Sequence, residues 1–173
     1  MAERNSRELS LEQRIQALED KLAIQQLIMS YPLVVDSGAV DVAASLWTAD
    51  GIFDRGAADS EKHSGNFEGA YGLDAILKEI GGSALQAARE AGLCHVMTAP
   101  QITISGDNAV AIGYTLMVGR DGAEFRIRRP TANRWEIVRD GSEWKIKRRT
   151  LRLIDGSPAA RELLGQAVQT KAP

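Results

Sequence analysis

Hydrophobic residues recur at helical spacing in the first third of the chain. Ser10 and Gln13 have the spacing of a capping box, and an amphipathic pattern follows at Leu11, Ile15, Leu18, Leu22, Leu27, Ile28 and Tyr31. This pattern predicts a helix from about residue 10 to the low thirties, which Pro32 kinks or ends, and the segment 37–38 closes it. Asp41 is placed to cap a shorter helix that runs through Trp47 and stops at residues 50–51.

The periodicity changes from helical to alternating along the rest of the chain. Short strands are predicted at 51–55 and 66–69, and a third helix over 72–91, with the pair Gly81-Gly82 as a potential break. Beyond Gly92 the period is two, and turn residues separate four strand-like runs over 94–105, 108–119, 124–139 and 143–154. A last helix is predicted over 158–168. Helices followed by an antiparallel meander are typical of the α+β class.

The length of the chain favours one domain. A chain of 173 residues has room for a single core, and no linker or internal repeat divides it. We therefore expect a polar tail over 1–9, an α+β domain over 10–155 and a C-terminal extension, with the terminal helix, over 156–173.

Composition excludes several classes of protein. The single cysteine, Cys94, cannot form an intramolecular disulfide, and two histidines, His63 and His95, cannot complete a structural zinc site with it. No apolar run reaches the length of a membrane span, and the charged N-terminus does not resemble a signal peptide, so we expect a cytoplasmic protein without a membrane partner.

The net charge of −2 is unevenly distributed. Residues 1–119 hold 8 basic and 16 acidic side chains, whereas residues 120–152 hold 11 basic and 5 acidic ones. The basic residues are spread along predicted strands rather than packed into one run, so nucleic-acid binding is not favoured. Electrostatic pairing of helices with sheet, or of one subunit with another, is the better interpretation.

Two side chains are candidates for proton transfer. Asp36 closes an apolar run at the C-terminal end of a helix, where burial and the helix dipole both disfavour a charge. It is either a tuned carboxylate or part of a solvated turn. His95 opens a strand on the face opposite Cys94, which argues against a Cys–His pair. It is either functional or an ordinary strand residue.

Other catalytic motifs are not found. The sequence has no Gly-x-Ser-x-Gly elbow and no glycine-rich phosphate loop, and His63 lies in a polar loop. Arg148, Arg149 and Arg152 fall on the last predicted strand, where solvent-facing charges are the ordinary interpretation.

Several short motifs carry a family resemblance. They are Ile24-Gln25-Gln26-Leu27-Ile28 followed by Tyr31 and Asp36, then Asp41 with Leu46-Trp47-Thr48 and Asp50-Gly51, then His95, and finally Trp144-Lys145-Ile146 before Arg149. Over about residues 15–155 this pattern resembles the SnoaL-like proteins of the nuclear-transport-factor-2-like superfamily, closest to the scytalone dehydratase and hexachlorocyclohexane dehydrochlorinase group. The resemblance implies a cystatin-like cone, in which N-terminal helices pack on a curved antiparallel sheet around one pocket.

The resemblance also implies a site without cofactor or metal. Asp36 and His95 match the dyad of that group, and Arg149 aligns with an arginine of the dehydrochlorinase. By simple alternation, however, Arg149 lies opposite Trp144 and Ile146, so it reaches the pocket only if a bulge intervenes. Whether Arg149 or Arg148 faces the pocket stays open.

The implied function is that of a lyase or isomerase acting on a hydrophobic small molecule, cyclic or acyclic. Two alternatives remain: a non-catalytic subunit resembling the β subunit of aromatic-ring-hydroxylating dioxygenases, and a polyketide-cyclase-like binding protein. The resemblance further implies a homo-oligomer, a dimer or trimer. The pocket candidates are Tyr31, Val35, Trp47, Phe53, Met97, Tyr114, Met117 and Trp135.

Overall fold

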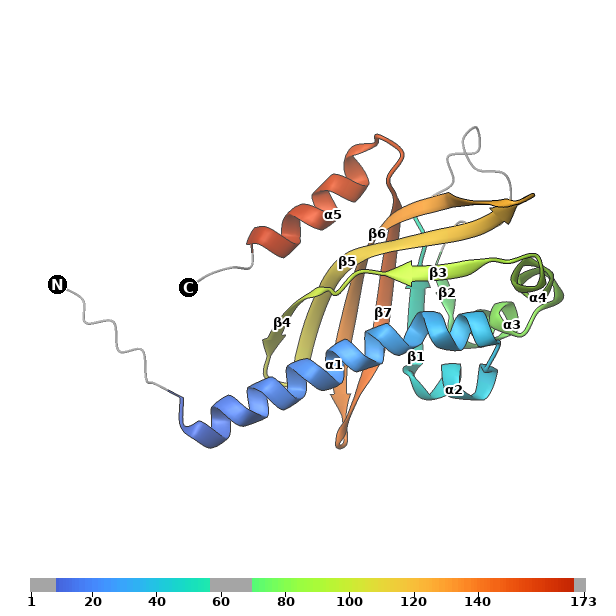
Figure 1. Cartoon of the computed structure of the whole chain (residues 1–173). Helices are drawn as coiled ribbons and strands as arrows, with labels where there is room; N and C mark the ends of the chain where they lie inside the picture. The colour runs from blue at the N-terminus through green and yellow to red at the C-terminus, as the bar shows by residue number, and fades with distance from the viewer. Residues whose placement is uncertain (1–8, 57–69, 170–173) are drawn as a thin grey trace.

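The computed structural model describes residues 9–56 and 70–169, which form helices packed against one curved sheet (Figure 1). The helices are α1 (Leu11–Ser37), α2 (Val40–Ser45), α3 (Leu73–Ile80), α4 (Ser83–Glu90) and α5 (Pro158–Gln169). The strands are β1 (Trp47–Asp54), β2 (Ala70–Gly72), β3 (Cys94–Met97), β4 (Gln101–Ser105), β5 (Asn108–Asp121), β6 (Glu124–Asp140) and β7 (Glu143–Leu153). This arrangement confirms the predicted α+β class.

The sheet has the order β2-β1-β7-β6-β5-β3, and β4 also pairs with β5. Only the β1–β7 pair is parallel among the described strands. Helix α1 runs across one face of the sheet, and α3 and α4 lie near the C-terminal end of α1. Helix α5 covers part of the opposite face of the sheet (Figure 1). The long hairpin strands β5 and β6 therefore form one wall of the space below α1.

Helix α1 begins at the predicted capping box and closes at residues 37–38 as predicted, although its helical turns continue past the low thirties. Its capping box is present, since Gln13 N donates to Ser10 Oγ at 3.2 Å and Ser10 N donates to Gln13 Oε1 at 2.9 Å. Pro32 does not end the helix, which continues to Ser37 and stops at Gly38 with a left-handed φ of 73°. The missing N–H of Pro32 removes one helical hydrogen bond, but buried residues on both sides of it hold the segment against the sheet. Asp36 consequently stays in the last turn.

Two other boundaries differ from the predicted ones, and a third feature, the potential break at Gly81-Gly82, is present. Trp47 opens strand β1 instead of continuing a helix, because the second helix already ends at Ser45. The Gly81-Gly82 pair splits the third helix in two. Pro100, which cannot donate to a ladder, lies between β3 and β4 and divides the first strand-like run. The predicted strand at 66–69 and the residues around His63 lie outside the described residues.

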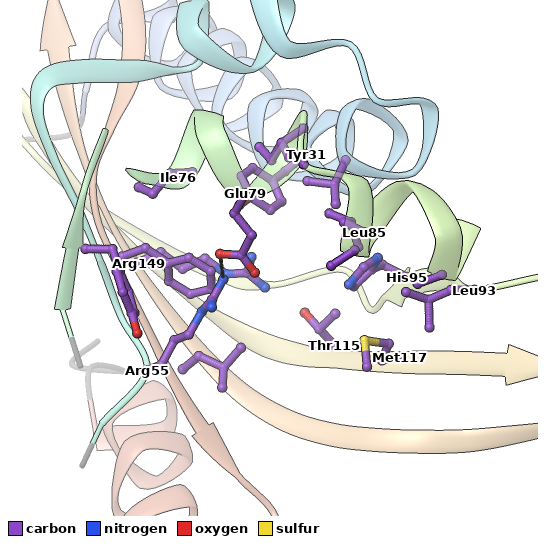
Figure 2. A pocket seen from close by; sticks show the side chains of 18 of the residues that line it. Tyr31, Arg55, Ile76, Glu79, Leu85, Leu93, His95, Thr115, Met117 and Arg149 are labelled. Atoms are coloured by element: carbon purple, nitrogen blue, oxygen red, sulfur yellow. Dashed lines mark hydrogen bonds and ion pairs between the residues drawn. The ribbon is translucent and has the colours of Figure 1, made fainter. Parts of the chain in front are cut away.

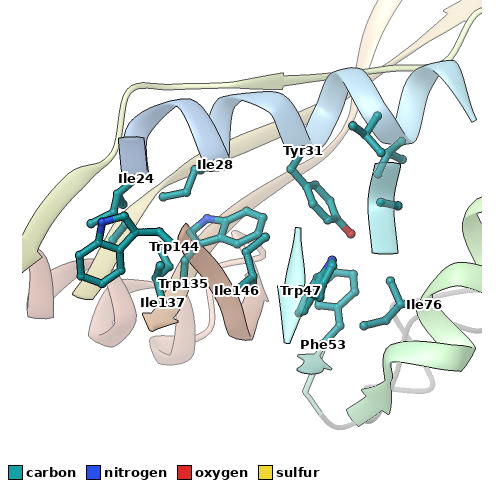
Figure 3. Close-up of a cluster of buried hydrophobic side chains, with 14 of the residues drawn as sticks. Ile24, Ile28, Tyr31, Trp47, Phe53, Ile76, Trp135, Ile137, Trp144 and Ile146 are labelled. Carbon is teal, nitrogen blue, oxygen red and sulfur yellow. The ribbon is translucent and has the colours of Figure 1, made fainter. Parts of the chain in front are cut away.

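The core lies between α1 and the concave face of the sheet (Figure 3). Ile24 and Ile28 of α1 are fully buried against Ile137 and Ile146, while Tyr31 meets the ring of Trp135 edge-on at 5.2 Å. These three residues thus form the face of α1 that packs on the sheet.

Charged residues connect the helical half to the basic strands, as the charge distribution suggests. Asp20 of α1 accepts a hydrogen bond from Arg139 at 2.8 Å, and this contact holds the pKa of the Asp20 carboxyl below its usual value. Asp54 of β1 pairs with Arg148 at 2.6 Å and with Arg152 at 3.1 Å. Arg148 is therefore bound to Asp54 at the rim of the sheet and does not line the cavity.

Candidate functional site

A cavity of about 820 Å³ lies between the concave face of the sheet and helices α1, α3 and α4. Figure 2 shows residues from all of these elements pointing into it. Its lining is mainly apolar with a few polar groups, which is the usual character of a small-molecule site. The lining includes Tyr31, Val35, Phe53, Arg55, Tyr71, Ile76, Glu79, Leu85, Leu93, His95, Thr115, Met117, Arg129, Thr131 and Arg149.

Asp36 and His95, which are 59 residues apart in sequence, meet beside this cavity. Asp36 Oδ1 lies 2.6 Å from His95 Nδ1, and Asp36 Oδ2 accepts the backbone N–H of His95 at 2.7 Å. Both side chains are about one-fifth exposed. Since a carboxylate only accepts hydrogen bonds, Nδ1 carries the proton and Nε2 keeps its lone pair. The carboxylate therefore fixes both the tautomer and the position of the imidazole.

The position of Asp36 follows from the late end of α1. Gly38 caps the helix. Its N–H donates to the carbonyl oxygen of Val35, and the N–H of Ala39 donates to that of Val34. Arg89 of α4 donates from its guanidinium to the carbonyl oxygen of Val35 at 3.1 Å, which offsets the negative end of the helix. This local positive charge reduces the penalty for placing a carboxylate there.

Arg149 lies on the cavity face of β7 because a bulge interrupts the strand. Glu136 pairs with Arg148 and Ile137 pairs with Ile146, so Lys147 is the extra residue on β7. The bulge reverses the alternation, and Ile146 and Arg149 both point inward. The alternation conflict noted for the sequence is thereby removed.

The Arg149 guanidinium is buried, with 4% exposure of the residue. Its carbon lies 4.4 Å from the ring centre of Trp135 and 4.7 Å from those of Tyr31 and Phe53, and Nε donates to Asn133 Oδ1 at 2.9 Å. Burial lowers the pKa of the Arg149 guanidinium. Burial also raises the pKa of the Tyr31 hydroxyl, whose ring lies against that guanidinium. Three aromatic faces and one amide thus solvate a cation that has left water.

A second group of charges stands near Arg149. Arg55, the residue that follows β1, pairs with Glu79 of α3 at 2.5 Å, and the Arg55 side chain is 7% exposed while that of Glu79 is 44% exposed. Arg129 of β6 also lines the cavity, and burial lowers its pKa, with a further lowering by the charge of Arg55. In Figure 2 Arg149, Arg55 and Glu79 lie toward one end of the cavity and His95 and Met117 toward the other.

Half of the predicted pocket residues line the cavity, namely Tyr31, Val35, Phe53 and Met117. Trp47 and Trp135 lie behind the cavity wall in the core. Met97 is partly buried and packs against that core. Tyr114 is 43% exposed on the other face of β5, since it is three residues from Met117 and alternation sends the two side chains apart.

The sequence interpretation missed Arg55, Glu79, Arg129 and Thr115, although the pattern held a signal for Arg55 and Arg129. Arg55 is two residues from Phe53 and Arg129 is six from Trp135, so each shares a strand face with a residue recognised as apolar and inward. Thr115 pairs with Thr131 across the sheet, and its buried Oγ1 makes no hydrogen bond within the described residues.

The described residues give two further findings. They contain no group of three or more His, Cys, Asp or Glu side chains that could hold a metal ion. None of their helices is both long and apolar enough to cross a membrane.

A curved sheet closed by helices around one deep cavity defines a cystatin-like, nuclear-transport-factor-2-like fold. The SnoaL-like domain family matches residues 16–150, and the chain belongs to this family. No curated protein matches the chain.

Solved structures support this assignment. An NTF2-like protein with a cystatin-like fold from Novosphingobium aromaticivorans is 31% identical, with a TM-score of 0.79, and the match covers 92% of this chain and 99% of that one. A candidate scytalone dehydratase from the same organism is 22% identical, with a TM-score of 0.62 and coverage of 81% and 87%. The β subunit of a candidate aromatic-ring-hydroxylating dioxygenase is 19% identical, with a TM-score of 0.59 and coverage of 80% and 91%. The last two similarities concern the fold alone.

Proposed function

We propose that this protein is a cofactor-independent lyase or isomerase that removes a proton from carbon in a hydrophobic, cyclic small molecule. The observation that carries the proposal is the pair of hydrogen bonds between Asp36 and His95. Oδ1 of Asp36 binds the ring Nδ1, and Oδ2 accepts the backbone N–H of His95. Two contacts from one carboxylate to one residue position an imidazole as a general base, and His95 lines the cavity while Asp36 stands behind it.

In the proposed reaction His95 Nε2 takes a proton from a substrate carbon. The electron pair of the broken C–H bond forms a C=C bond. In an elimination, a leaving group on the neighbouring carbon departs with its bonding pair, and a departing hydroxide can receive the proton from the imidazolium as water. In an isomerisation nothing leaves, and the proton returns to a different carbon. Asp36 stabilises the imidazolium in both cases.

Arg149 is suited to stabilise negative charge that develops on a leaving group or on an enolate oxygen. It is buried, and its described contacts are with aromatic rings and an amide. A charge fixed in a low-dielectric site acts strongly on an anion that forms in the transition state. Arg149 acts here with no proton transfer of its own.

The test uses 5-nitrobenzisoxazole, a planar bicyclic carbon acid whose ring opens to a coloured phenolate when a base removes its proton. We expect saturable turnover by the wild-type protein and loss of that turnover in His95→Ala. Cys94→Ser, at the adjacent exposed position, is the matched control and should retain the wild-type rate. Quenching of tryptophan fluorescence measures binding of the probe separately. Binding without His95-dependent ring opening would contradict the proposal.

Two other functions are compatible with the fold: a non-catalytic dioxygenase β subunit and a polyketide-cyclase-like binding protein. Neither requires a hydrogen bond between Asp36 and His95. A binding protein would take up the probe equally well in the wild type and in His95→Ala with no turnover in either, so the same pair of measurements separates these functions from a lyase or isomerase.

A further inference from the structure

The charges of the cavity wall are unequal. Among the described lining residues, Arg55, Lys78, Arg129 and Arg149 are cationic, whereas Glu79 is the one carboxylate. Arg55 and Glu79 both act electrostatically on Arg129 and on Arg149, so these groups share one electrostatic environment. The described residues that line the end of the cavity away from His95 are therefore mainly cationic and lie beside apolar walls.

Arg149 makes this positive end a place for an anion. In the described part of the chain its direct partners are the Asn133 amide, the Tyr31 hydroxyl and three aromatic rings, none of which carries a negative charge. Buried cations in proteins are ordinarily paired with an anion or held by several donors and acceptors. An anionic group of the ligand can supply that pairing when the site is occupied.

Glu79 is a partner of Arg55 that a ligand carboxylate can replace. It comes from α3 at the rim of the cavity and is partly exposed, whereas its partner Arg55 is almost fully covered by Phe53 and Tyr71 at 4.5 and 5.3 Å. A ligand carboxylate can replace Glu79 Oε2 as the acceptor for Arg55 Nη2. Glu79 can then turn toward solvent, where its charge is hydrated.

We propose that the substrate is an amphipathic organic anion, with an apolar ring system near His95 and a carboxylate bound by the arginines at the other end of the cavity. This inference rests on the proposed function because it names the substrate of the same site. Three strand spacings separate β3, which carries His95, from β7, which carries Arg149, or about 14 Å between their backbones along the sheet. Both side chains extend into the cavity from these strands, which shortens the distance that the substrate has to span.

The test compares 2-naphthoate with its neutral isostere 2-naphthamide by titration calorimetry. Wild-type protein should bind the carboxylate at least about tenfold more tightly, since charge-assisted bonds are roughly twice as strong as neutral ones. In Arg129→Met, which retains Arg55 and Arg149, the preference should fall by at least about threefold, while the amide affinity stays within about twofold. Arg128→Met is the matched control, because Arg128 is the neighbouring exposed residue that faces Asp121.

The wild-type comparison needs no variant, so the proposal remains testable if Arg129→Met is unstable. Equal affinity for acid and amide, or an unchanged preference in Arg129→Met, would overturn it. His95→Ala should still prefer the acid. If it does and 5-nitrobenzisoxazole is not turned over by any variant, the proposed function fails and the ligand class stands. If the neutral probe is turned over but the acid is not preferred, only the ligand class fails.

A different observation concerns the N-terminal half of α1, which extends beyond the sheet (Figure 1). Residues 11–19 are exposed on all sides. Along one face, Leu11, Ile15, Leu18 and Leu22 follow at intervals of four, three and four, and each is between 46% and 68% exposed. This is the spacing of a coiled-coil seam, and a helix of this length is marginal in water without a partner.

Charges beside the seam indicate what covers it. In a parallel pair of α1 helices, Arg14 of one copy meets Glu19 of the second, and Lys21 meets Gln26. In an antiparallel pair, Arg14 would face Lys21 and Glu12 would face Glu19, so like charges would meet. The face that packs on the sheet, with Ile24 and Ile28, lies away from the seam, which leaves room for a second molecule.

We infer that α1 pairs in parallel with α1 of a second copy of this chain. Sedimentation velocity should show a concentration-dependent dimer, and Leu18→Glu should weaken it at least about 100-fold, because one buried leucine is lost from each copy. Val168→Glu, at a residue of α5 with 70% exposure, is the control of equal hydrophobicity loss. A monomeric wild type, or a dimer unaffected by Leu18→Glu, would overturn the pairing.

Orientation is tested by oxidation in a Cys94→Ser background. Leu11→Cys should form a disulfide-linked dimer by itself in a parallel pair. In an antiparallel pair the two positions would lie about 17 Å apart, too far for a disulfide, and crosslinking would require Leu11→Cys mixed with Leu22→Cys. Crosslinking only in the mixture would overturn the parallel form.

Discussion

Asp36→Asn is expected to lower the rate constant for carbon–proton abstraction by about 10²–10⁴, with little change in KM. An asparagine at this position can still accept the backbone N–H of His95 through its carbonyl oxygen. Its NH₂ group then faces the ring Nδ1 and donates to it, so Nε2 carries the proton instead. The imidazole remains in place but in the tautomer that cannot act as a base toward the cavity.

Turnover of 5-nitrobenzisoxazole measures this effect, with fluorescence titration for binding. Asp41→Asn is the matched control, because Asp41 is an exposed residue of α2 a few residues further along the chain. The same Asp36→Asn variant should unfold at nearly the wild-type temperature, because the asparagine carbonyl oxygen still accepts the backbone N–H of His95. Full activity in this variant would show that Asp36 serves only to join α1 to β3.

The fold could be predicted from the sequence because it depends on periodicity and turns. Capping at Ser10, the break at Gly81-Gly82 and the glycine turns of the meander are local signals, and the structure contains each of them. Residues 37–38 correctly marked the close of α1, but the helical pattern itself was predicted to stop in the low thirties, because Pro32 has a local preference for ending helices that burial of Tyr31, Val34 and Val35 overrides. The turn beyond Pro32 matters because it carries Asp36.

The site depends on information that no single segment holds. The approach of Asp36 to His95 is set by how α1 crosses β3, and here the family resemblance supplied what periodicity could not. The inward position of Arg149 depends on the bulge at Lys147, which has no signature in the run Lys145–Arg152. Arg129 needs no bulge, since it shares the face of Trp135, but a cation pointing into a cavity contradicts the expectation that strand arginines face water.

The positive balance of residues 120–152 gains a second meaning from these positions. Part of it forms the expected ties to the helical half, as in the pair of Arg139 with Asp20. Another part, at Arg129 and Arg149, lines the cavity instead. Charge counting along the sequence cannot separate these uses, because both leave the same residues on strands.

Arg149→Met is expected to lower activity strongly while changing stability little. Turnover of 5-nitrobenzisoxazole should fall by about 10²–10³, the usual effect of removing one group that stabilises a developing oxyanion, here the phenolate. The free energy of unfolding should change by less than about 2 kcal/mol, because two effects offset each other. Methionine avoids the desolvation of a buried cation and still packs against Tyr31, Phe53 and Trp135. It also leaves the buried Asn133 Oδ1 without its donor, which costs about 1–3 kcal/mol.

The two effects can be separated with a second substitution. Arg149→Met/Asn133→Leu removes the orphaned amide oxygen and should be more stable than Arg149→Met by about 1–3 kcal/mol in chemical denaturation, with no recovery of turnover. Arg148→Met is the matched control with the reverse outcome: it breaks the pair with Asp54 outside the cavity and so lowers stability while leaving the rate constant unchanged. If Arg149→Met were strongly destabilised and its remaining folded fraction fully active, Arg149 would be a structural cation of the core, and the negative charge of the reaction would have to be stabilised by Arg55 or Arg129.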